Sequence, residues 1–598
     1  MKSPANYYRQ RLSELEKSMT NHQYRLRWLS VLRLLVFLAL FPDIFFAIPA
    51  NLWLGIVLTI ITVSAFLFLV KIHNRQTTRL RHIQALVKIN EQEIESLNYK
   101  FDMFYPGIEF IDTTHPYSFD MDLFGEGSLF QSINRTTTCR GREHLAILIS
   151  QETLDADTIY LRQASVQELV LMPKLIQDFR AAGSMNAESE GDLIVLNEWI
   201  NQPSYYLKRK GWLQAIVLLP AITLLSILLA VFIPFFRIFP LTLFLSQLIV
   251  VGIRLSHTSR EHAKICKRLE ALKKYQSLLK IIEEENYNSK ELIGLNKIIK
   301  QGNTSAAHAI QKLATIVAAF DNRLNILAAI FLEGFLLWDI QCMVRLERWK
   351  TIQGRYFNKW IDVIARFDAL VSLSTFAFNH KHLSYPLITD SKILDAKNMG
   401  HILIPHNERI CNDFRIVKEG DFMLITGANM AGKSTFLRTV ATNMILAMAG
   451  APVCAEEFIF RPMALFSSMR TSDSLKKHES YFYAELRRLK EMLNRLQTGE
   501  RLFIILDEIL KGTNSFDKQK GSHAALQKIL GLNGTGIIAT HDLDLVAIQE
   551  EYPERIQNMC FEIEIDQAKI SFDYKLREGV TTKMNALLLM RQMGIIGS

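Results

Sequence analysis

Apolar residues are concentrated in two blocks of the chain, and a short turn-like segment divides each block. The first block covers residues 28–70 with a break at 48–51, and the second covers residues 212–253 with a break at 234–240. Each half holds about twenty mostly uncharged residues, the length of a helix that crosses the hydrocarbon core of a bilayer. The pattern predicts four transmembrane helices in two hairpins, over residues 28–71 and 212–253.

Basic residues gather at the outer ends of both blocks, whereas the two turns carry only Arg237. The positive-inside rule therefore predicts that both turns face outward and that residues 1–27 and the remaining segments are cytoplasmic. Two hairpins buried in a helical core are the alternative, which the length of the uncharged runs disfavours. A cleavable signal peptide is also disfavoured, because the first block starts late and continues into a second span.

The polar segments divide into helical and α/β parts. Residues 71–100 continue the second span as a charged helix, and residues 101–200 mix loops and helices. Residues 254–302 carry leucine and isoleucine at helical spacing among dense charges. This last stretch predicts either a long exposed arm or an amphipathic helix in a bundle. Residues 303–400 continue as helix. The apolar stretch 326–337 contains Glu333, with Asp339 and Arg345 close by, which favours a core helix over a further span.

From about residue 415 short β-like runs alternate with helical stretches. These runs are residues 422–426, 502–506 and 536–540. Alternation of this kind is typical of an α/β fold with a parallel sheet. The predicted fold class is thus an α/β domain over residues 401–598, joined to an all-α part that carries the two hairpins.

Composition changes this picture little. The chain has 598 residues, a net charge of +9 and six scattered cysteines, and its mean hydropathy is +0.10. The length predicts several domains, and the cysteine spacing predicts reduced thiols rather than a zinc site or disulfides. A basic balance suits nucleic acid or an anionic membrane surface. Much of the excess flanks the apolar blocks, so charge alone does not argue for DNA.

A glycine-rich loop follows the first β-like run and precedes a helical run. It has the pattern GxxxxGK[ST] and comprises Gly427, Ala428, Asn429, Met430, Ala431, Gly432, Lys433, Ser434 and Thr435. In a strand–loop–helix context this is a phosphate-binding loop, in which backbone N–H groups surround phosphate oxygens. We expect Lys433 to reach the β- and γ-phosphates of ATP and Ser434 to ligate Mg²⁺.

Two further strand ends supply candidate catalytic groups. The run 502–506 ends in Asp507 and Glu508, and the run 536–540 ends at His541. Ligands of α/β folds bind at the carboxyl ends of strands. We expect Asp507 to hold the Mg²⁺, Glu508 to orient the attacking water and His541 to contact the γ-phosphate. The order of these motifs is that of ABC-type ATPases, a resemblance that implies a nucleotide sandwiched in a dimer.

Five stretches together resemble the MutS family. Residues 427–435 are similar to the family's GPNMGGKST, 507–515 to DEIGRGTST and 539–541 to ATH, while residues 470–485 and 574–583 resemble its later conserved segments. Upstream, residues 128–141 resemble the stretch where the family's lever domain begins. The resemblance covers residues 101–200 and 300–598 and implies a lever region in two parts, 72–211 and 303–400. The second hairpin and residues 254–302 stand where the family carries its DNA clamp.

The chain also departs from the family pattern. Asn514 stands where the family has a serine that reaches the partner subunit's nucleotide, so the resemblance implies a trans contact from Thr513, Asn514 or Ser515. Arg409 stands where an aromatic residue stacks on adenine, which puts base selectivity in doubt. No segment resembles the family's mismatch-reading and connector domains, and its C-terminal helix-turn-helix looks missing.

The resemblance implies an ATP-hydrolysing homodimer on the inner face of a bacterial membrane. Its levers would engage mismatched or branched DNA in repair or recombination, or a protein partner. A basic stretch offers either phosphate contacts or a membrane-proximal helix, and comprises Arg260, Lys264, Lys267, Arg268, Lys273 and Lys274. An ABC-like transporter is an alternative, although four spans are few and the motif LSGGQ is missing. A membrane scaffold switched by ATP, with a protein partner and no DNA role, is a second alternative.

Overall fold

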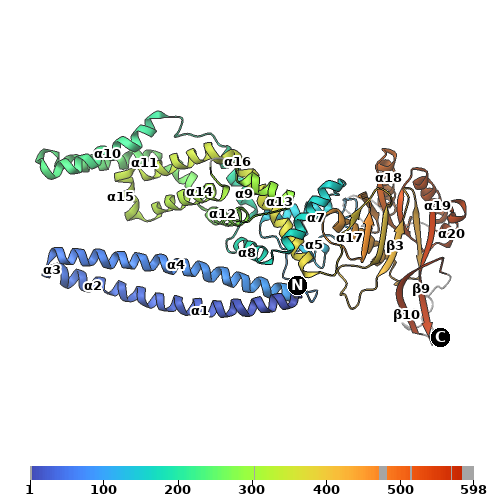
Figure 1. The fold of residues 1–598 in the computed structure, drawn as a ribbon. Helices are drawn as coiled ribbons and strands as arrows, with labels where there is room; N and C mark the ends of the chain where they lie inside the picture. Colours follow the sequence, from blue (N-terminus) through green and yellow to red (C-terminus); the bar gives the residue numbers. More distant parts are fainter. Residues whose placement is uncertain (1–2, 302–303, 471–480, 512–514, 567–568, 582–598) are drawn as a thin grey trace.

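Two helical hairpins extend from a helical body, and the α/β part of the chain lies at the opposite end of this body (Figure 1). The structure is a computed structural model that describes residues 3–301, 304–470, 481–511, 515–566 and 569–581. The tips of both hairpins point the same way, away from the α/β part.

Hairpin 1 is made almost entirely of two long helices. Its elements are α1 (Pro4–Leu38), α2 (Leu40–Pro42), the π-helical turn η1 (Asp43–Ala47), α3 (Ile48–Ala50) and α4 (Leu52–Ser96). Asn51 has an extended backbone and its side chain accepts a hydrogen bond from the Leu54 N–H, so it caps α4. Asp43, the one acidic residue near the tip, accepts a hydrogen bond of 2.7 Å from Thr62.

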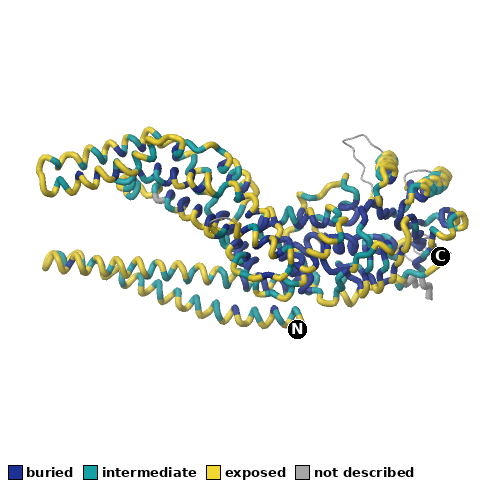
Figure 2. Tube along the Cα trace, turned by 45° about the horizontal axis from the view of Figure 1, so that its top comes forward, coloured by how far each residue is buried: buried dark blue, intermediate teal, exposed yellow. Residues whose placement is uncertain are grey.

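Hairpin 2 consists of α10 (Lys210–Phe232), η3 (Pro234–Ile238) and α11 (Phe239–Cys266). The buried side chains of Gln247 and Thr223 join the two helices through a hydrogen bond of 2.6 Å. Among the described residues, four helical stretches are long and apolar enough to cross a membrane: Pro4–Ala50, Leu52–Ser96, Lys210–Phe232 and Pro234–Cys266. Their apolar side chains are largely exposed, as the yellow hairpins of Figure 2 show.

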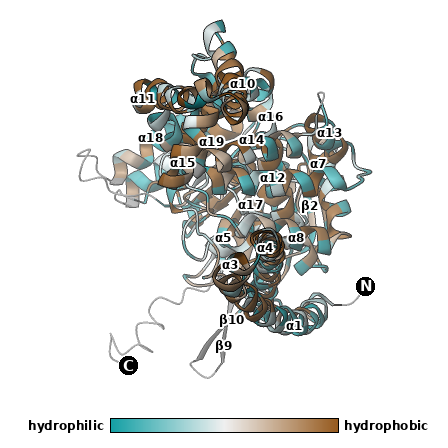
Figure 3. Ribbon diagram, turned by 90° about the vertical axis from the view of Figure 1, so that its left-hand side faces the viewer, coloured by the Kyte–Doolittle hydropathy of each residue, from teal (hydrophilic) through white to brown (hydrophobic). Residues whose placement is uncertain are grey.

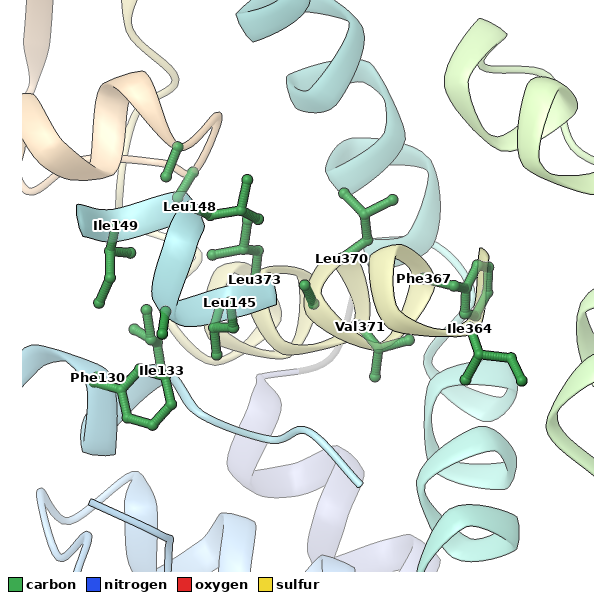
Figure 4. Packing of buried hydrophobic residues seen from close by; sticks show 14 of the residues in the cluster. Phe130, Ile133, Leu145, Leu148, Ile149, Ile364, Phe367, Leu370, Val371 and Leu373 are labelled. Carbon is green, nitrogen blue, oxygen red and sulfur yellow. The ribbon is translucent and has the colours of Figure 1, made fainter. Parts of the chain in front are cut away.

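The helical body is built from shorter helices around one long one. Its elements are η2 (Ile108–Phe110), α5 (Leu129–Ile133), α6 (Cys139–Ser150), α7 (Ala156–Val170), α8 (Pro173–Ser184), α9 (Glu190–Asn201), α12 (Leu269–Glu284), α13 (Lys290–Ile299), α14 (Ala306–Phe320), η4 (Asp321–Leu324), α15 (Ile326–Leu336) and α16 (Trp338–Asn379). The C-terminal half of α16 is buried against α5 and α6 (Figure 4), and Leu373 of α16 belongs to one apolar cluster with Ile133 and Leu145 of these helices.

The structure decides between the two readings of residues 254–302. The stretch does not form one long arm, because α11 ends at Cys266 and α12 and α13 follow as separate helices. The apolar face of α12 is buried in the bundle, including Leu272, Tyr275 and Leu279. The structure therefore agrees with the second alternative, an amphipathic helix that buries one face in a bundle.

The prediction of a core helix over residues 326–337 is wrong. These residues form α15, whose apolar side chains are mostly exposed rather than packed in a core. Helix α15 lies beside hairpin 2 and meets α16 at an angle of 76°. The charged residues near this stretch do not mark a soluble core helix, because Glu333 and Asp339 turn inward and are buried while the apolar side chains face outward.

Two sheets form the α/β part. The six-stranded sheet has the order β10-β9-β4-β8-β7-β6, and only β10 is antiparallel to its neighbour; the four-stranded sheet has the order β1-β5-β2-β3. The strands are β1 (Leu387–Ile388), β2 (Leu394–Met399), β3 (Asn412–Ile416), β4 (Phe422–Gly427), β5 (Glu457–Phe460), β6 (Ala464–Ser468), β7 (Leu502–Asp507), β8 (Thr535–Ala539), β9 (Ile556–Asp566) and β10 (Lys569–Glu578). The helices are α17 (Lys433–Met448), α18 (Tyr481–Gln497), α19 (Ser515–Gly531), α20 (Leu543–Val546) and α21 (Ile548–Glu551).

The three β-like runs of the sequence coincide with β4, β7 and β8, which lie side by side in the order β4-β8-β7. All three are buried along their length apart from Asp507 at the end of β7. Because the three strands are parallel, their carboxyl ends meet at one edge of the sheet. The predicted parallel α/β arrangement is therefore present, and it places the three motif-bearing loops together.

Candidate functional site

The glycine-rich loop connects the central strand β4 to α17. Its backbone is left-handed at Met430 (φ 68°) and Gly432 (φ 100°), and Gly432 directly precedes the first residue of α17. A side chain at Gly432 would stand 3.0 Å from the ring of Tyr574, so both the backbone angle and the space favour glycine there. The loop thus brings backbone N–H groups to the N-terminus of a sixteen-residue helix, an arrangement suited to phosphate.

Lys433 lies under this loop and is almost fully buried. Its Nζ donates hydrogen bonds to the carbonyl oxygens of Gly427 and Ala428, at 2.7 and 2.9 Å, and lies 3.1 Å from Nε2 of His541. Burial lowers the pKa of Lys433 to about 8, and the neighbouring carboxylates of Asp507 and Glu508 oppose that shift. Lys433 is thus a buried cation at the centre of the loop, near the other predicted site residues.

Ser434 and Asp507 come together across the sheet edge. The hydroxyl of Ser434 donates a hydrogen bond of 2.7 Å to Oδ2 of Asp507. A hydroxyl and a carboxylate oxygen are ligands that suit Mg²⁺, which usually takes only one or two protein oxygens and completes its shell with water and phosphate. The donor set predicted from the sequence is therefore chemically fit for Mg²⁺.

Glu508 is held from two sides. Its backbone is left-handed (φ 60°), and its N–H donates to the carbonyl of Ala539 on the neighbouring strand at 2.8 Å. One carboxylate oxygen lies 3.5 Å from Nε2 of His541 and the other 3.1 Å from Nζ of Lys518. Burial, followed by the charge of Lys433, lowers the pKa of His541, which keeps the ring neutral near pH 7.

These groups line one pocket of about 590 Å³, a volume typical of small-molecule sites. Residues 429, 430 and 432–435 of the loop line it together with Asp507, Glu508 and His541, and its rim comes from residues 399–412, Phe561 and Tyr574. The predicted loop residues Gly427, Ala428 and Ala431 are not among its lining residues. The sequence reading missed the site contributions of Lys511, Lys518 and Tyr574. Lys511 and Lys518 lie within eleven residues of Asp507 in the sequence, so this short separation could have indicated that they lie near the site. Tyr574 is far from Gly432 in the sequence, and only the fold brings the two together.

Arg409 does not take the place of a stacking aromatic residue. Its guanidinium is buried and donates to Sγ of Cys454 at 2.7 Å, to the hydroxyl of Tyr99 at 3.0 Å and to the carbonyl of Ile404 at 2.7 Å. The residues on either side of Arg409 line the pocket instead. Arg409 therefore fixes the shape of the rim segment and ties it to Tyr99, three residues beyond the end of α4.

The predicted partner-subunit contact cannot be placed in the same way. Thr513 and Asn514 lie outside the described residues, as does the segment 471–480 within the family-like stretch 470–485. Ser515 is the first residue of α19. The end of that stretch is described: the buried carboxylate of Glu485 accepts a hydrogen bond of 2.6 Å from the Leu510 N–H and so fixes the turn after Glu508.

The basic stretch after hairpin 2 is largely neutralised. Four of its six cations pair with carboxylates: Lys264 with Glu261, Arg268 with Asp192, Lys273 with Glu270, and Lys274 with Glu188. Lys274 is buried in its pair. Lysine and arginine bind a phosphate backbone by displacing the counterions condensed on the nucleic acid, which requires side chains that are free to reach the phosphates. This stretch is therefore a weaker candidate for DNA contact than its sequence indicates.

Comparison with known proteins identifies the region that carries the pocket. The family model for MutS domain V matches residues 423–595. The human protein MutS protein homolog 4 is 29% identical over 260 residues, which cover 42% of this chain and 27% of that protein. DNA mismatch repair protein MutS of Ehrlichia ruminantium (strain Welgevonden) is 32% identical over 234 residues, covering 39% of this chain and 29% of that protein. The chain thus matches less than a third of the length of either relative. Residues 423–595 thus match MutS domain V, and the chain is similar to MutS proteins over about two fifths of its length.

Proposed function

We propose that this protein is a membrane-anchored ATPase of MutS type that binds ATP with Mg²⁺ at the pocket above and works as a homodimer. The observation that carries the proposal is the gathering of Lys433, Ser434, Asp507, Glu508 and His541 at one sheet edge, on three adjacent strand ends. The name of the bacterial relative, a DNA mismatch repair protein, extends the proposal to mismatched or branched DNA as the coupled ligand.

Each side chain has a role that follows from its position. Lys433 would exchange its carbonyl contacts for phosphate oxygens, since the loop's N–H groups and the N-terminus of α17 already favour an anion there. Ser434 and Asp507 would hold Mg²⁺, which supplies positive charge beside the phosphates. Glu508 would orient and polarise the attacking water, and Lys518 and His541 fix the carboxylate for that task.

The membrane part of the proposal rests on the exposed apolar helices. Hairpins 1 and 2 point in one direction and carry the four stretches that are long and apolar enough to span. We propose that both hairpins cross one membrane with their tips on the far side, so that the nucleotide pocket is cytoplasmic. Anchoring the levers in a bilayer would turn nucleotide-driven closure of the dimer into movement relative to the membrane. Because most cations after hairpin 2 are paired with carboxylates, a protein partner in place of DNA would also be compatible with this surface.

The test is ATP turnover by the full chain in liposomes, with and without double-stranded and branched DNA. Glu508→Gln should lower turnover by about 10²-fold or more while ATP still binds, because it removes the water-orienting carboxylate. Glu554→Gln, at an exposed position away from the pocket, is the matched control and should turn over normally.

Turnover that is equal in the parent chain and Glu508→Gln would contradict the proposed hydrolysis. Turnover raised by DNA supports the DNA-coupled form of the proposal. Turnover that is real but indifferent to every DNA tested would overturn that form and favour an ATP-switched scaffold with a protein partner.

A further inference from the structure

Helix α15 exposes an apolar surface that a water-soluble protein would bury. Its sequence, ILAAIFLEGFL, contains one charged residue. Five large apolar residues on and just before the helix are between 44% and 76% exposed: Leu324, Ile326, Leu327, Ile330 and Phe331. Clustered exposure of this size marks an interaction surface rather than ordinary scatter.

This surface continues the apolar surface of hairpin 2. Helix α15 packs against both α10 and α11. The rings of Phe335 and Phe244 lie 5.0 Å apart, and Gly334 leaves no space for a side chain, since a Cβ there would stand 2.1 Å from the Phe244 ring. Figure 3 shows α10, α11 and α15 together, with brown apolar residues prominent on all three. Whatever covers the outer face of hairpin 2 therefore also meets α15.

The one charge on α15 is turned away from this surface. Glu333 is 7% exposed, and its carboxylate accepts a hydrogen bond of 3.0 Å from the Asp339 N–H at the start of α16. Asp339 in turn pairs with Arg323 at 3.1 Å, and both groups are sheltered. The acidic groups near the end of α15 are thus placed inside the protein rather than against an apolar solvent.

Both ends of α15 attach to the same part of the protein. Helix α14, which precedes α15, packs on α16, which follows α15. The indole N–H of Trp338 in α16 donates to the carbonyl of Ala319 in α14 at 2.9 Å. A second indole, of Trp349, donates to Ala309 at 2.7 Å further along. The chain therefore leaves the body and returns to it on one side. Its eleven residues rise only about 16 Å, roughly half of the hydrocarbon core, so α15 is too short to cross.

We propose that α15 is a re-entrant membrane helix that dips into the bilayer leaflet on the cytoplasmic side, beside hairpin 2. Lipid acyl chains cover the face formed by Leu327, Ile330 and Phe331. The inference rests on the proposed membrane position of hairpin 2 and adds a fifth membrane-embedded element. The left-handed Leu337 (φ 51°) makes the sharp turn by which the chain returns into α16, at 76° to α15.

The test compares three single cysteine variants of the full chain in liposomes. Leu327→Cys reports on α15, Leu228→Cys on the exposed face of α10, and Leu171→Cys on the end of α7 in the body, and the native residues are exposed to similar extents. A membrane-impermeant maleimide is applied from both sides, and modification is read by mass on the peptide that holds the new cysteine. In parallel, a fluorophore on each cysteine is exposed to phosphatidylcholine spin-labelled near its headgroup, with the parent chain's signal subtracted.

We expect Leu327→Cys and Leu228→Cys to react on the order of tenfold or more slowly than Leu171→Cys, because hydrocarbon excludes a charged reagent. The spin-labelled lipid should quench the fluorophore at residue 327 but not at residue 171. Fast reaction at 327 with protection at 228 would overturn the re-entrant helix and leave the spans intact. Fast reaction at 228 would overturn the membrane position itself. Protection at 327 without quenching by lipid would overturn the proposal in favour of a second copy covering α15.

Discussion

The two hairpins join the same helix, α16, through different kinds of contact. Hairpin 1 joins its C-terminal end through buried polar groups, with Glu93 of α4 bonded to Arg135, Arg180 and Asn379 at 2.6–2.7 Å, and Tyr8 of α1 bonded to Asn379 at 2.7 Å. Hairpin 2 joins the opposite half through α14, α15 and apolar packing. The polar contacts there include Glu347, which accepts N–H bonds from residues 205–207, and the pair His262–Asp321 at 2.9 Å.

This difference suggests different tasks for the hairpins. Buried ion pairs tolerate little displacement, since each partner is costly to leave unpaired, whereas apolar surfaces can slide. Hairpin 1 also connects to the candidate pocket, because Tyr99, just after α4, accepts a hydrogen bond from Arg409 in the rim segment. Our hypothesis is that hairpin 1, tied rigidly to the body, senses the state of the pocket, and that hairpin 2 with α15 is a passive anchor against which the body can move.

The largest expected effect comes from removing the charge at the base of hairpin 1. Glu93→Ala leaves Arg135 and Arg180 buried without their anion, which should cost about 3–5 kcal/mol of stability. Hydrogen exchange should accelerate at the C-terminal end of α4 and at the end of α16. Glu91→Ala, on the exposed side of the same helix, is the control and should change neither. Unchanged exchange in Glu93→Ala would mean that the polar network does not hold hairpin 1.

Acid should weaken the same junction. Glu93 lies 23 residues beyond the end of the first apolar block, well outside it. Burial alone would raise its pKa, but Arg135 and Arg180 outweigh burial and lower the pKa to about 2 from an ordinary value of 4.5. A depressed pKa means that the stabilisation, on the order of 3 kcal/mol, is complete above pH 4.5 and is lost as the pH falls toward 2.

The measurement is hydrogen exchange at the end of α4 as a function of pH, corrected for the intrinsic rate. The parent chain should lose protection below about pH 4.5. Glu93→Gln has no proton to gain and should show a flat profile from a lower starting protection. An equal loss of protection at low pH in both proteins would mean that another group is responsible for the effect.

The contact of hairpin 2 should be weaker and should not involve the pocket. Glu347→Gln replaces a charged acceptor of three backbone N–H groups, which should cost about 2–3 kcal/mol at the base of α10. Exchange should accelerate around residues 205–207 while ATP affinity stays at the parent value. Glu198→Gln, in the neighbouring α9, is a suitable comparison. A large loss of ATP affinity in Glu347→Gln would contradict the assignment of hairpin 2 as a passive anchor.

The grouping of the residues in the candidate pocket could be predicted from the sequence far better than these junctions, for a physical reason. A phosphate loop is local, since strand, glycines, lysine and helix follow one another within fifteen residues, and short apolar strands carry Asp507 and His541 to the same edge. The partners at the base of hairpin 1 lie far apart in the chain: Glu93 meets Arg135 and Asn379, 42 and 286 residues away. Nothing in the pattern distinguishes them from solvated charges.

The same reasoning explains the error over α15 and the doubt over Arg409. Charges near an apolar stretch indicate a soluble helix only if they are solvated. Glu333 and Asp339 are buried instead: Glu333 accepts from the Asp339 N–H, and Asp339 pairs with Arg323. Arg409 occupied a position where family resemblance predicted an adenine contact. Its actual partners, Tyr99 and Cys454, lie 310 and 45 residues away, so only the folded chain reveals that it shapes the rim rather than the base site.

The smallest effect is the sharpest test of the comparison. Tyr99→Phe removes the hydroxyl that accepts from Arg409 and nothing else, at a cost of about 1–2 kcal/mol at a charged hydrogen bond. If hairpin 1 is coupled to the pocket, ATP affinity should change by a few-fold while overall stability stays close to that of the parent. Tyr105→Phe removes an exposed hydroxyl bonded to Glu109 and should leave ATP affinity unchanged. Equal affinities in the two variants would mean that the Tyr99–Arg409 contact is only a structural tie and that both hairpins are anchors.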